Sequence, residues 1–90
     1  MASPRVVIYT SGACMYCWRA LRLLETRRIA FEQRDLTGDA EGREKLADQV
    51  GRTSVPQIFI DGRAIGGFDD LRALDASGQL AKLLAAAPAS

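Results

Sequence analysis

The dipeptide Asp61-Gly62 is the feature that most constrains how this chain folds. It joins two short apolar runs, QIFI at residues 57–60 and RAI at residues 63–65. Asp-Gly between such runs is the strongest short-range signal of a β-hairpin, because a tight hairpin turn needs positive φ at both of its central residues. The last two strands are therefore expected to be antiparallel neighbours.

Two more strands and a helix are predicted upstream of the hairpin. The β-branched run VVIY at residues 6–9 is typical of a buried strand, and alternation around Phe31 and Gln33 indicates another. Between them lies the apolar stripe of an amphipathic helix, formed by Cys17, Ala20, Leu21 and Leu24. The opposite face carries charges that we expect to be solvated: Arg19, Arg22 and Glu25.

Three further helices are expected. Asp39 is suited to cap the first of them and Gly51 to end it. The second follows Gly66-Gly67 and the third follows Gly78. Their apolar stripes are Leu46, Ala47 and Val50; Phe68, Leu71 and Leu74; and Leu80, Leu83 and Leu84.

The predicted order of elements is β-α-β-α-β-β-α-α, which indicates an α/β fold. Helical crossovers favour parallel strand neighbours, whereas the hairpin is antiparallel, so we expect a four-stranded mixed sheet flanked by helices. The chain has no linker, repeat or low-complexity segment. Residues 1–90 are therefore expected to form a single domain.

The composition is that of an ordinary soluble domain, with 48% hydrophobic and 26% charged residues. Twelve basic and eleven acidic residues nearly cancel, so we expect neither nucleic acid nor a membrane as a partner. The first apolar run is too short for a secretory signal. These observations favour a cytoplasmic protein, and we expect a monomer.

The only two cysteines, Cys14 and Cys17, form a Cys-x-x-Cys pair in the segment TSGACMYCWRAL. A permanent disulfide between them would close a very small loop and stabilise the fold little. Structural zinc needs about four Cys or His ligands, and the chain has no histidine. We therefore expect no metal site within one chain.

A redox role for the pair has positive support. Cys14 is expected at the N-cap of the helix, where free backbone N–H groups and the helix dipole favour a thiolate. Cys17 lies one turn further, on the apolar stripe. This order makes Cys14 the attacking nucleophile and Cys17 the resolving thiol of a redox-active disulfide.

Four elements together resemble the glutaredoxin family, specifically its small bacterial dithiol class: CMYC, GRTSVPQIFI, IGGFDD and LRALDASGQL. The resemblance covers nearly the whole chain. It implies a thioredoxin-like fold and a glutathione-dependent thiol–disulfide oxidoreductase that reduces protein disulfides and glutathionylated proteins. Glutathione would then be the electron donor.

The resemblance also implies a glutathione site. Val55-Pro56 would be a cis bond, whose backbone pairs with the cysteinyl part of the ligand; a plain turn proline is the alternative. The N–H groups that open the helix after Gly66-Gly67 would hold the γ-glutamyl carboxylate. Asp70 is expected to be structural, and Arg43 is a further candidate for the glycine carboxylate. The residues expected to bind glutathione are Tyr16, Arg52, Ser54, Val55, Pro56, Gly67, Phe68 and Asp69.

The chain departs from the family at three positions. The family commonly has Pro where Met15 stands, Thr where Ser54 stands and often Lys where Ser11 stands. Loss of that lysine removes a charge that would stabilise a thiolate, whereas Met15 adds a backbone N–H at the start of the helix.

Two alternative functions remain open from the sequence. One is a homodimeric [2Fe–2S] carrier, in which each Cys14 and two glutathione molecules bind the cluster. The other is an NrdH-type redoxin, which thioredoxin reductase would reduce. The GGFDD segment argues against the redoxin.

Overall fold

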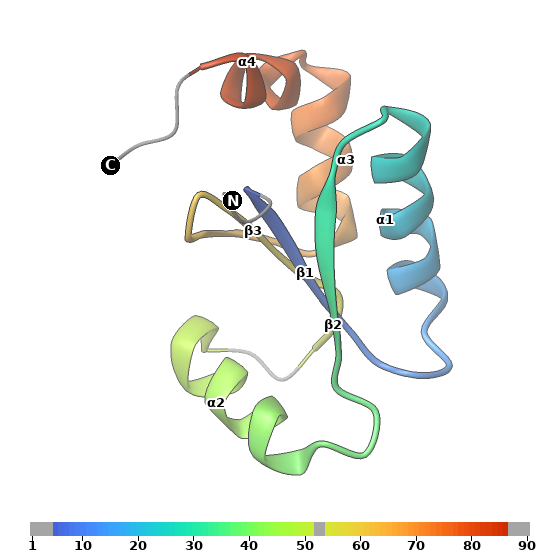
Figure 1. The fold of residues 1–90 in the computed structure, drawn as a ribbon, viewed down its shortest axis with the longest axis vertical. Helices are drawn as coiled ribbons and strands as arrows, with labels where there is room; N and C mark the ends of the chain where they lie inside the picture. The colour runs from blue at the N-terminus through green and yellow to red at the C-terminus, as the bar shows by residue number, and fades with distance from the viewer. Residues whose placement is uncertain (1–4, 52–53, 87–90) are drawn as a thin grey trace.

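The structure is a computed structural model that describes residues 5–51 and 54–86. Its elements alternate as the sequence predicts (Figure 1). In chain order they are β1 (Val6–Thr10), α1 (Met15–Thr26), β2 (Phe31–Asp35), α2 (Ala40–Val50), β3 (Gln57–Ile60), β4 (Arg63–Gly66), α3 (Phe68–Ala76) and α4 (Gln79–Ala85). Within the described part of the chain, no helix is long and apolar enough to cross a membrane.

The four strands form one mixed sheet in the order β2-β1-β3-β4. β1 pairs with β2 in parallel, and β3 is antiparallel to both β1 and β4. The mixed sheet is therefore confirmed. The expectation of parallel neighbours is right for the crossover through α1 and wrong for the crossover through α2.

The position of α2 explains this difference. Gln57, the first residue of β3, pairs with Tyr9 near the end of β1, and the last residue of β1, Thr10, pairs with the last of β2, Asp35. The chain thus leaves β2 and enters β3 at the same end of the strands, and Figure 1 shows α2 at that end. A crossover that does not travel the length of the sheet leaves the next strand antiparallel.

The helices form the hydrophobic core on two faces of the sheet. On one face α1, α3 and α4 pack against alternate residues of β1 and β3; the buried cluster is Val6, Ile8, Ala20, Leu24, Ile58, Ile60, Leu71 and Leu80. On the other face α2 packs through Leu46, with Leu36 and Phe59.

One residue of α4 that was predicted to lie in the core, Leu83, is exposed. Leu83 is 41% exposed, whereas Leu80 is buried and Leu84 is half-buried. Leu80 and Leu84 are four residues apart and share one side of the helix, while Leu83 lies at the border of that stripe.

The local signals for turns and caps act as predicted. Asp61 and Gly62 have φ of 52° and 81°, the positive values that the hairpin turn requires. The Asp39 carboxylate accepts a hydrogen bond from the Gly42 N–H at 2.9 Å, and Gly51 ends α2 in the left-handed conformation with φ of 73°.

Arg5 joins the hairpin to the end of α4. Its guanidinium donates to both carboxylate oxygens of Asp61 at 2.9 Å. It also donates to the backbone carbonyls of Leu83 and Leu84 at 2.9 Å. These carbonyls belong to the last turn of a helix, where a cation is favoured. One side chain therefore connects three segments that are distant in the sequence.

We predict that Arg5→Ala lowers the Tm at pH 7 by a few degrees, measured by thermal unfolding. The hydrogen bonds from Arg5 hold the pKa of the Asp61 carboxyl below its ordinary value of 3.8. A lowered pKa stabilises the fold above the ordinary value, and this contribution is lost as the pH falls through the folded-state pKa. The Tm difference should therefore shrink below about pH 4.

Asp61→Asn is the matched control, because Asn tolerates the positive φ at this position. In that background the pH-dependent part of the Arg5→Ala effect should disappear. A Tm difference with the same pH dependence in both backgrounds would contradict the role given to this ion pair.

Candidate active site

Cys14 occupies the junction between the loop after β1 and the first residue of α1. It is the N-cap of α1, with extended backbone angles (φ −123°, ψ 107°), as predicted. Its Sγ accepts a hydrogen bond from the Cys17 backbone N–H at 3.1 Å. The helix start therefore places a backbone donor and the positive end of the helix dipole at this sulfur. Cys14 is half-buried, so the sulfur can be reached from solvent.

Cys17 lies in a different environment although it is one helical turn away. Its side chain is only 2% exposed. Burial, followed by the hydrogen bond with Cys14, raises the pKa of the Cys17 thiol to about 12. Cys17 is therefore a neutral thiol at physiological pH, and both cysteines are free in this structure. The pair combines one accessible sulfur with one protected sulfur.

The segment before β3 lies beside the Cys14 sulfur. The Val55–Pro56 peptide bond is cis, and the Cys14 Sγ lies 3.7 Å from the Val55 carbonyl oxygen, to which it donates. Among the described residues, the Val55 N–H has no hydrogen-bond partner. A backbone donor that no described group pairs, next to a reactive sulfur, suits the binding of an extended peptide in β fashion.

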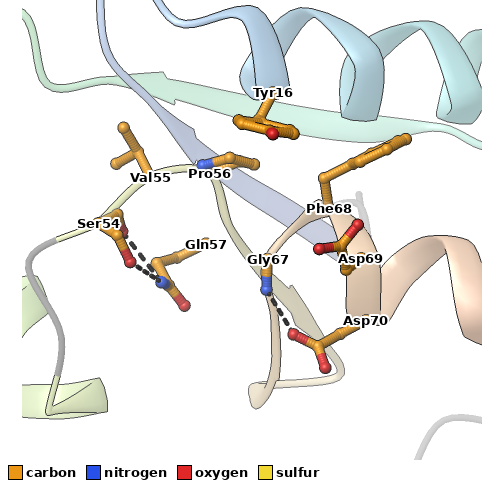
Figure 2. Close-up of a pocket in the computed structure, with 9 residues that line it drawn as sticks. All are labelled: Tyr16, Ser54, Val55, Pro56, Gln57, Gly67, Phe68, Asp69 and Asp70. Carbon is orange, nitrogen blue, oxygen red and sulfur yellow. Dashed lines mark hydrogen bonds between the residues drawn. The ribbon is translucent and has the colours of Figure 1, made fainter.

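A groove of about 200 Å³ lies against this segment. Figure 2 shows Tyr16 from α1 facing Pro56 on one side and Phe68 and Asp69 at the start of α3 on the other. The rings of Tyr16 and Phe68 are 6.3 Å apart between centroids. The groove brings together seven of the residues predicted to bind glutathione, namely Tyr16, Ser54, Val55, Pro56, Gly67, Phe68 and Asp69.

The start of α3 leaves backbone donors at the groove. The Asp70 carboxylate accepts a hydrogen bond from the Gly67 N–H at 3.0 Å, as expected of a structural cap (Figure 2). Gly66 has φ of 121°, and a Cβ there would lie 2.3 Å from an Asp70 carboxylate oxygen. In the described structure, the next two N–H groups, of Phe68 and Asp69, have no partner. They form an anion-binding position at a helix N-terminus.

Of the two predicted candidates for the glycine carboxylate, Arg52 lies outside the described residues, and Arg43 does not line the groove. Arg43 donates to the Leu36 carbonyl oxygen at 3.5 Å and to the Ser11 Oγ. It thereby places a guanidinium beside the position where the family often has lysine. This contact joins residues 32 positions apart, so the sequence pattern did not reveal it.

Two further features near the thiols were not predicted from the sequence. Gln57 lines the groove although it is buried, and its Nε2 donates to the Ser54 carbonyl oxygen at 3.0 Å. A polar residue at the head of an apolar strand was the available signal. Trp18 is 78% exposed on α1; its signal was a large aromatic residue outside the apolar stripe.

Metal binding by this chain alone finds no support in the described residues. No group of three or more His, Cys, Asp or Glu side chains there is arranged to hold a metal ion. A cluster would need ligands from a second chain and from glutathione, so the cluster-bridged dimer stays a prediction.

We predict that a thiol reagent such as iodoacetamide labels Cys14 alone in the reduced native protein near pH 7. Cys17 is buried and its pKa is raised to about 12, so it offers almost no thiolate near pH 7. Mass spectrometry of proteolytic fragments should show a single adduct in buffer and two in urea. Equal labelling of both cysteines in buffer would contradict the assigned asymmetry.

Comparison with known proteins identifies the family. A family model described as glutaredoxin matches residues 6–65. Glutaredoxin 3 of Escherichia coli K12 is 51% identical over 79 residues, which cover 88% of this chain and 95% of the relative. A glutaredoxin of Pseudomonas aeruginosa is 46% identical over 83 residues, covering 92% of this chain and 99% of the relative.

Solved structures agree with the sequence relatives. The solution structure of glutaredoxin from Brucella melitensis has a TM-score of 0.80 at 40% identity, covering 91% of this chain and 89% of the other. A buckwheat glutaredoxin–glutathione complex has a TM-score of 0.83 at 26% identity, covering 91% and 77%. With its thioredoxin-like fold and its Cys-x-x-Cys pair at a helix N-terminus, this chain belongs to the glutaredoxin family of glutathione-dependent thiol–disulfide oxidoreductases.

Proposed function

We propose that the chain reduces protein disulfides and glutathionylated proteins through Cys14 and Cys17. The observation that carries this proposal is the Cys14 sulfur, which accepts the Cys17 N–H at 3.1 Å and lies beside the Val55 carbonyl. The sulfur is activated where an extended substrate can reach it, and the second thiol lies one turn behind it.

The reduction of a protein disulfide by the two thiols needs no cofactor other than glutathione. The Cys14 thiolate attacks one sulfur of a protein disulfide, so that a Cys14–substrate bond forms and one substrate thiolate leaves. Cys17 then attacks the Cys14 sulfur, its proton passes to the departing second thiolate, and a Cys14–Cys17 disulfide remains. Two glutathione molecules reduce this bridge and leave as glutathione disulfide.

A glutathionylated substrate needs only Cys14. The thiolate takes the glutathionyl group and releases the protein thiol, and a second glutathione then frees Cys14 as glutathione disulfide forms. Because Cys17 is buried and neutral, it does not compete for the incoming disulfide. The unequal burial of the two thiols supports this division of roles.

The groove beside Cys14 is the proposed glutathione site. The related buckwheat glutaredoxin forms a complex with glutathione in its crystal structure, and in this chain the groove offers complementary groups. The Val55 backbone would pair with the cysteinyl residue, and the N–H groups of Phe68 and Asp69 would bind the γ-glutamyl carboxylate. The Asp69 carboxylate would meet the ammonium group, and Tyr16 would pack on the ligand.

We predict that Cys17→Ser keeps the removal of glutathione from a glutathionylated protein but loses the reduction of a protein disulfide. Cys14→Ser should lose both, because no other accessible thiol replaces it. The two activities are measured by coupling to NADPH through glutathione reductase. A Cys14→Ser variant active in either assay would refute the assignment of the nucleophile.

The electron donor is tested with the same wild-type protein. Turnover with glutathione and glutathione reductase is expected, and turnover with thioredoxin reductase alone is not. The reverse preference would favour the redoxin alternative over the proposed glutathione site.

We predict that Asp69→Asn raises the KM for glutathione about three- to tenfold, because one charged contact with the ligand is lost. Its neighbour gives a matched comparison: Asp70 accepts the Gly67 N–H, so Asp70→Asn should lower the Tm instead. An equal change of KM in both variants would assign the effect to the helix start rather than to the Asp69 carboxylate.

A further inference from the structure

A second groove, of about 340 Å³, runs between α1 and α3. Phe68 lines both this groove and the one beside Cys14. The apolar floor of this second groove includes Leu23 and Phe68, which are both half-buried. We name it the α1–α3 groove. A ligand chain that passes the Tyr16–Phe68 pair could therefore continue from the reactive sulfur along α1.

The α1–α3 groove is lined by four arginines and one carboxylate. Arg27 is neutralised by Asp75, which it contacts through two nitrogens at 3.0 Å. Arg72 lies 3.8 Å from the Asp69 carboxylate, a long pair between exposed side chains. Among the described residues, Arg19 and Arg22 have no carboxylate within ion-pair distance; Arg19 instead lies over the Tyr16 ring, 5.5 Å from its centroid. The groove thus keeps unpaired positive charge, although the chain as a whole is nearly neutral.

The exposed side of α1 next to the groove is apolar near the thiol. Met15 and Trp18 are 68% and 78% exposed, respectively. Trp18 is four residues before Arg22, so the two side chains lie on one side of the helix. Exposed aromatic and arginine side chains around a reactive centre are typical of surfaces that bind proteins.

We propose that the α1–α3 groove binds an acidic segment of the protein substrate, close in sequence to the cysteine that Cys14 attacks. This inference rests on the proposed function, because it names the substrate class of the same site. The apolar floor and the neighbouring Trp18 favour a polypeptide over a phosphate chain. The unpaired arginines select its charge.

The geometry sets where the acidic residues should lie. Arg19 and Arg22 are five and eight residues after Cys14, which corresponds to about 7.5 and 12 Å along the helix. An extended chain spans about 3.3 Å per residue. The acidic side chains are therefore expected roughly two to four positions from the target cysteine.

The first experiment measures binding without redox chemistry. Trp18 is the only tryptophan of the chain, and its exposed ring can report a nearby ligand through its fluorescence. The probe is a serine-containing peptide with three glutamates two to four positions from the serine, and its control replaces them with glutamine. Saturable quenching or a shift is expected with the acidic peptide alone, and it should weaken as salt is added.

The second experiment measures turnover of the same two peptides with a glutathionylated cysteine in place of the serine. The acidic peptide should have a kcat/KM about fivefold higher, and Arg22→Glu should remove this preference. The matched variant Arg63→Glu has the same charge change on β4, outside the α1–α3 groove, and should keep the preference. Arg22→Glu should leave turnover of a small glutathione–cysteine mixed disulfide unchanged.

The outcomes separate the two proposals. Activity on the small disulfide without a preference for the acidic peptide overturns the groove assignment and leaves the proposed function standing. Loss of preference in both arginine variants, or a stronger fluorescence response to an oligonucleotide, also overturns it. If the small disulfide is not turned over, the proposed function fails, and the fluorescence titration still decides whether the groove binds the acidic peptide.

Discussion

The antiparallel pairing of β1 with β3 is the constraint on which the site depends. β1 ends next to the loop that carries Cys14, and β3 begins next to Pro56. Because Tyr9 pairs with Gln57, the C-terminal end of β1 and the N-terminal end of β3 lie side by side at one end of the sheet. A parallel β3 would place Val55 at the other end of the strands, away from the sulfur. The 3.7 Å approach of Cys14 to Val55 therefore follows from strand direction.

At this end of the sheet, the start of α1 gives the two thiols different properties. Cys14 precedes the first turn of α1, so its side chain meets the free N–H groups of the helix start. Cys17 lies within that turn and is buried. Three residues of separation are enough to place one sulfur in contact with solvent and the other in a medium that disfavours its charge.

The helices, the strands and their ends were predictable because local sequence patterns determine them. Periodicity located the helices and strands, and Asp39, Gly51 and Asp61-Gly62 located ends and a turn, because each acts within a few residues of itself. The direction of β3, the Arg5 contacts with Asp61 and α4, and the contact of Arg43 with Ser11 depend on residues far apart in sequence. No local pattern contains that information. The expected glutathione residues came from a resemblance, and the fold brings most of them to one groove.

The substitution at Met15 is best understood through its backbone. Its side chain is 68% exposed, and the Arg19 guanidinium lies 3.7 Å from its sulfur, so it fills no part of the groove beside Cys14. What the position adds relative to proline is an N–H at the first residue of α1, directly after the Cys14 N-cap. Arg43 at Ser11 adds a cation close to the same turn. Both features lie at the helix start next to Cys14, whereas neither Met15 nor Arg43 lines the ligand groove.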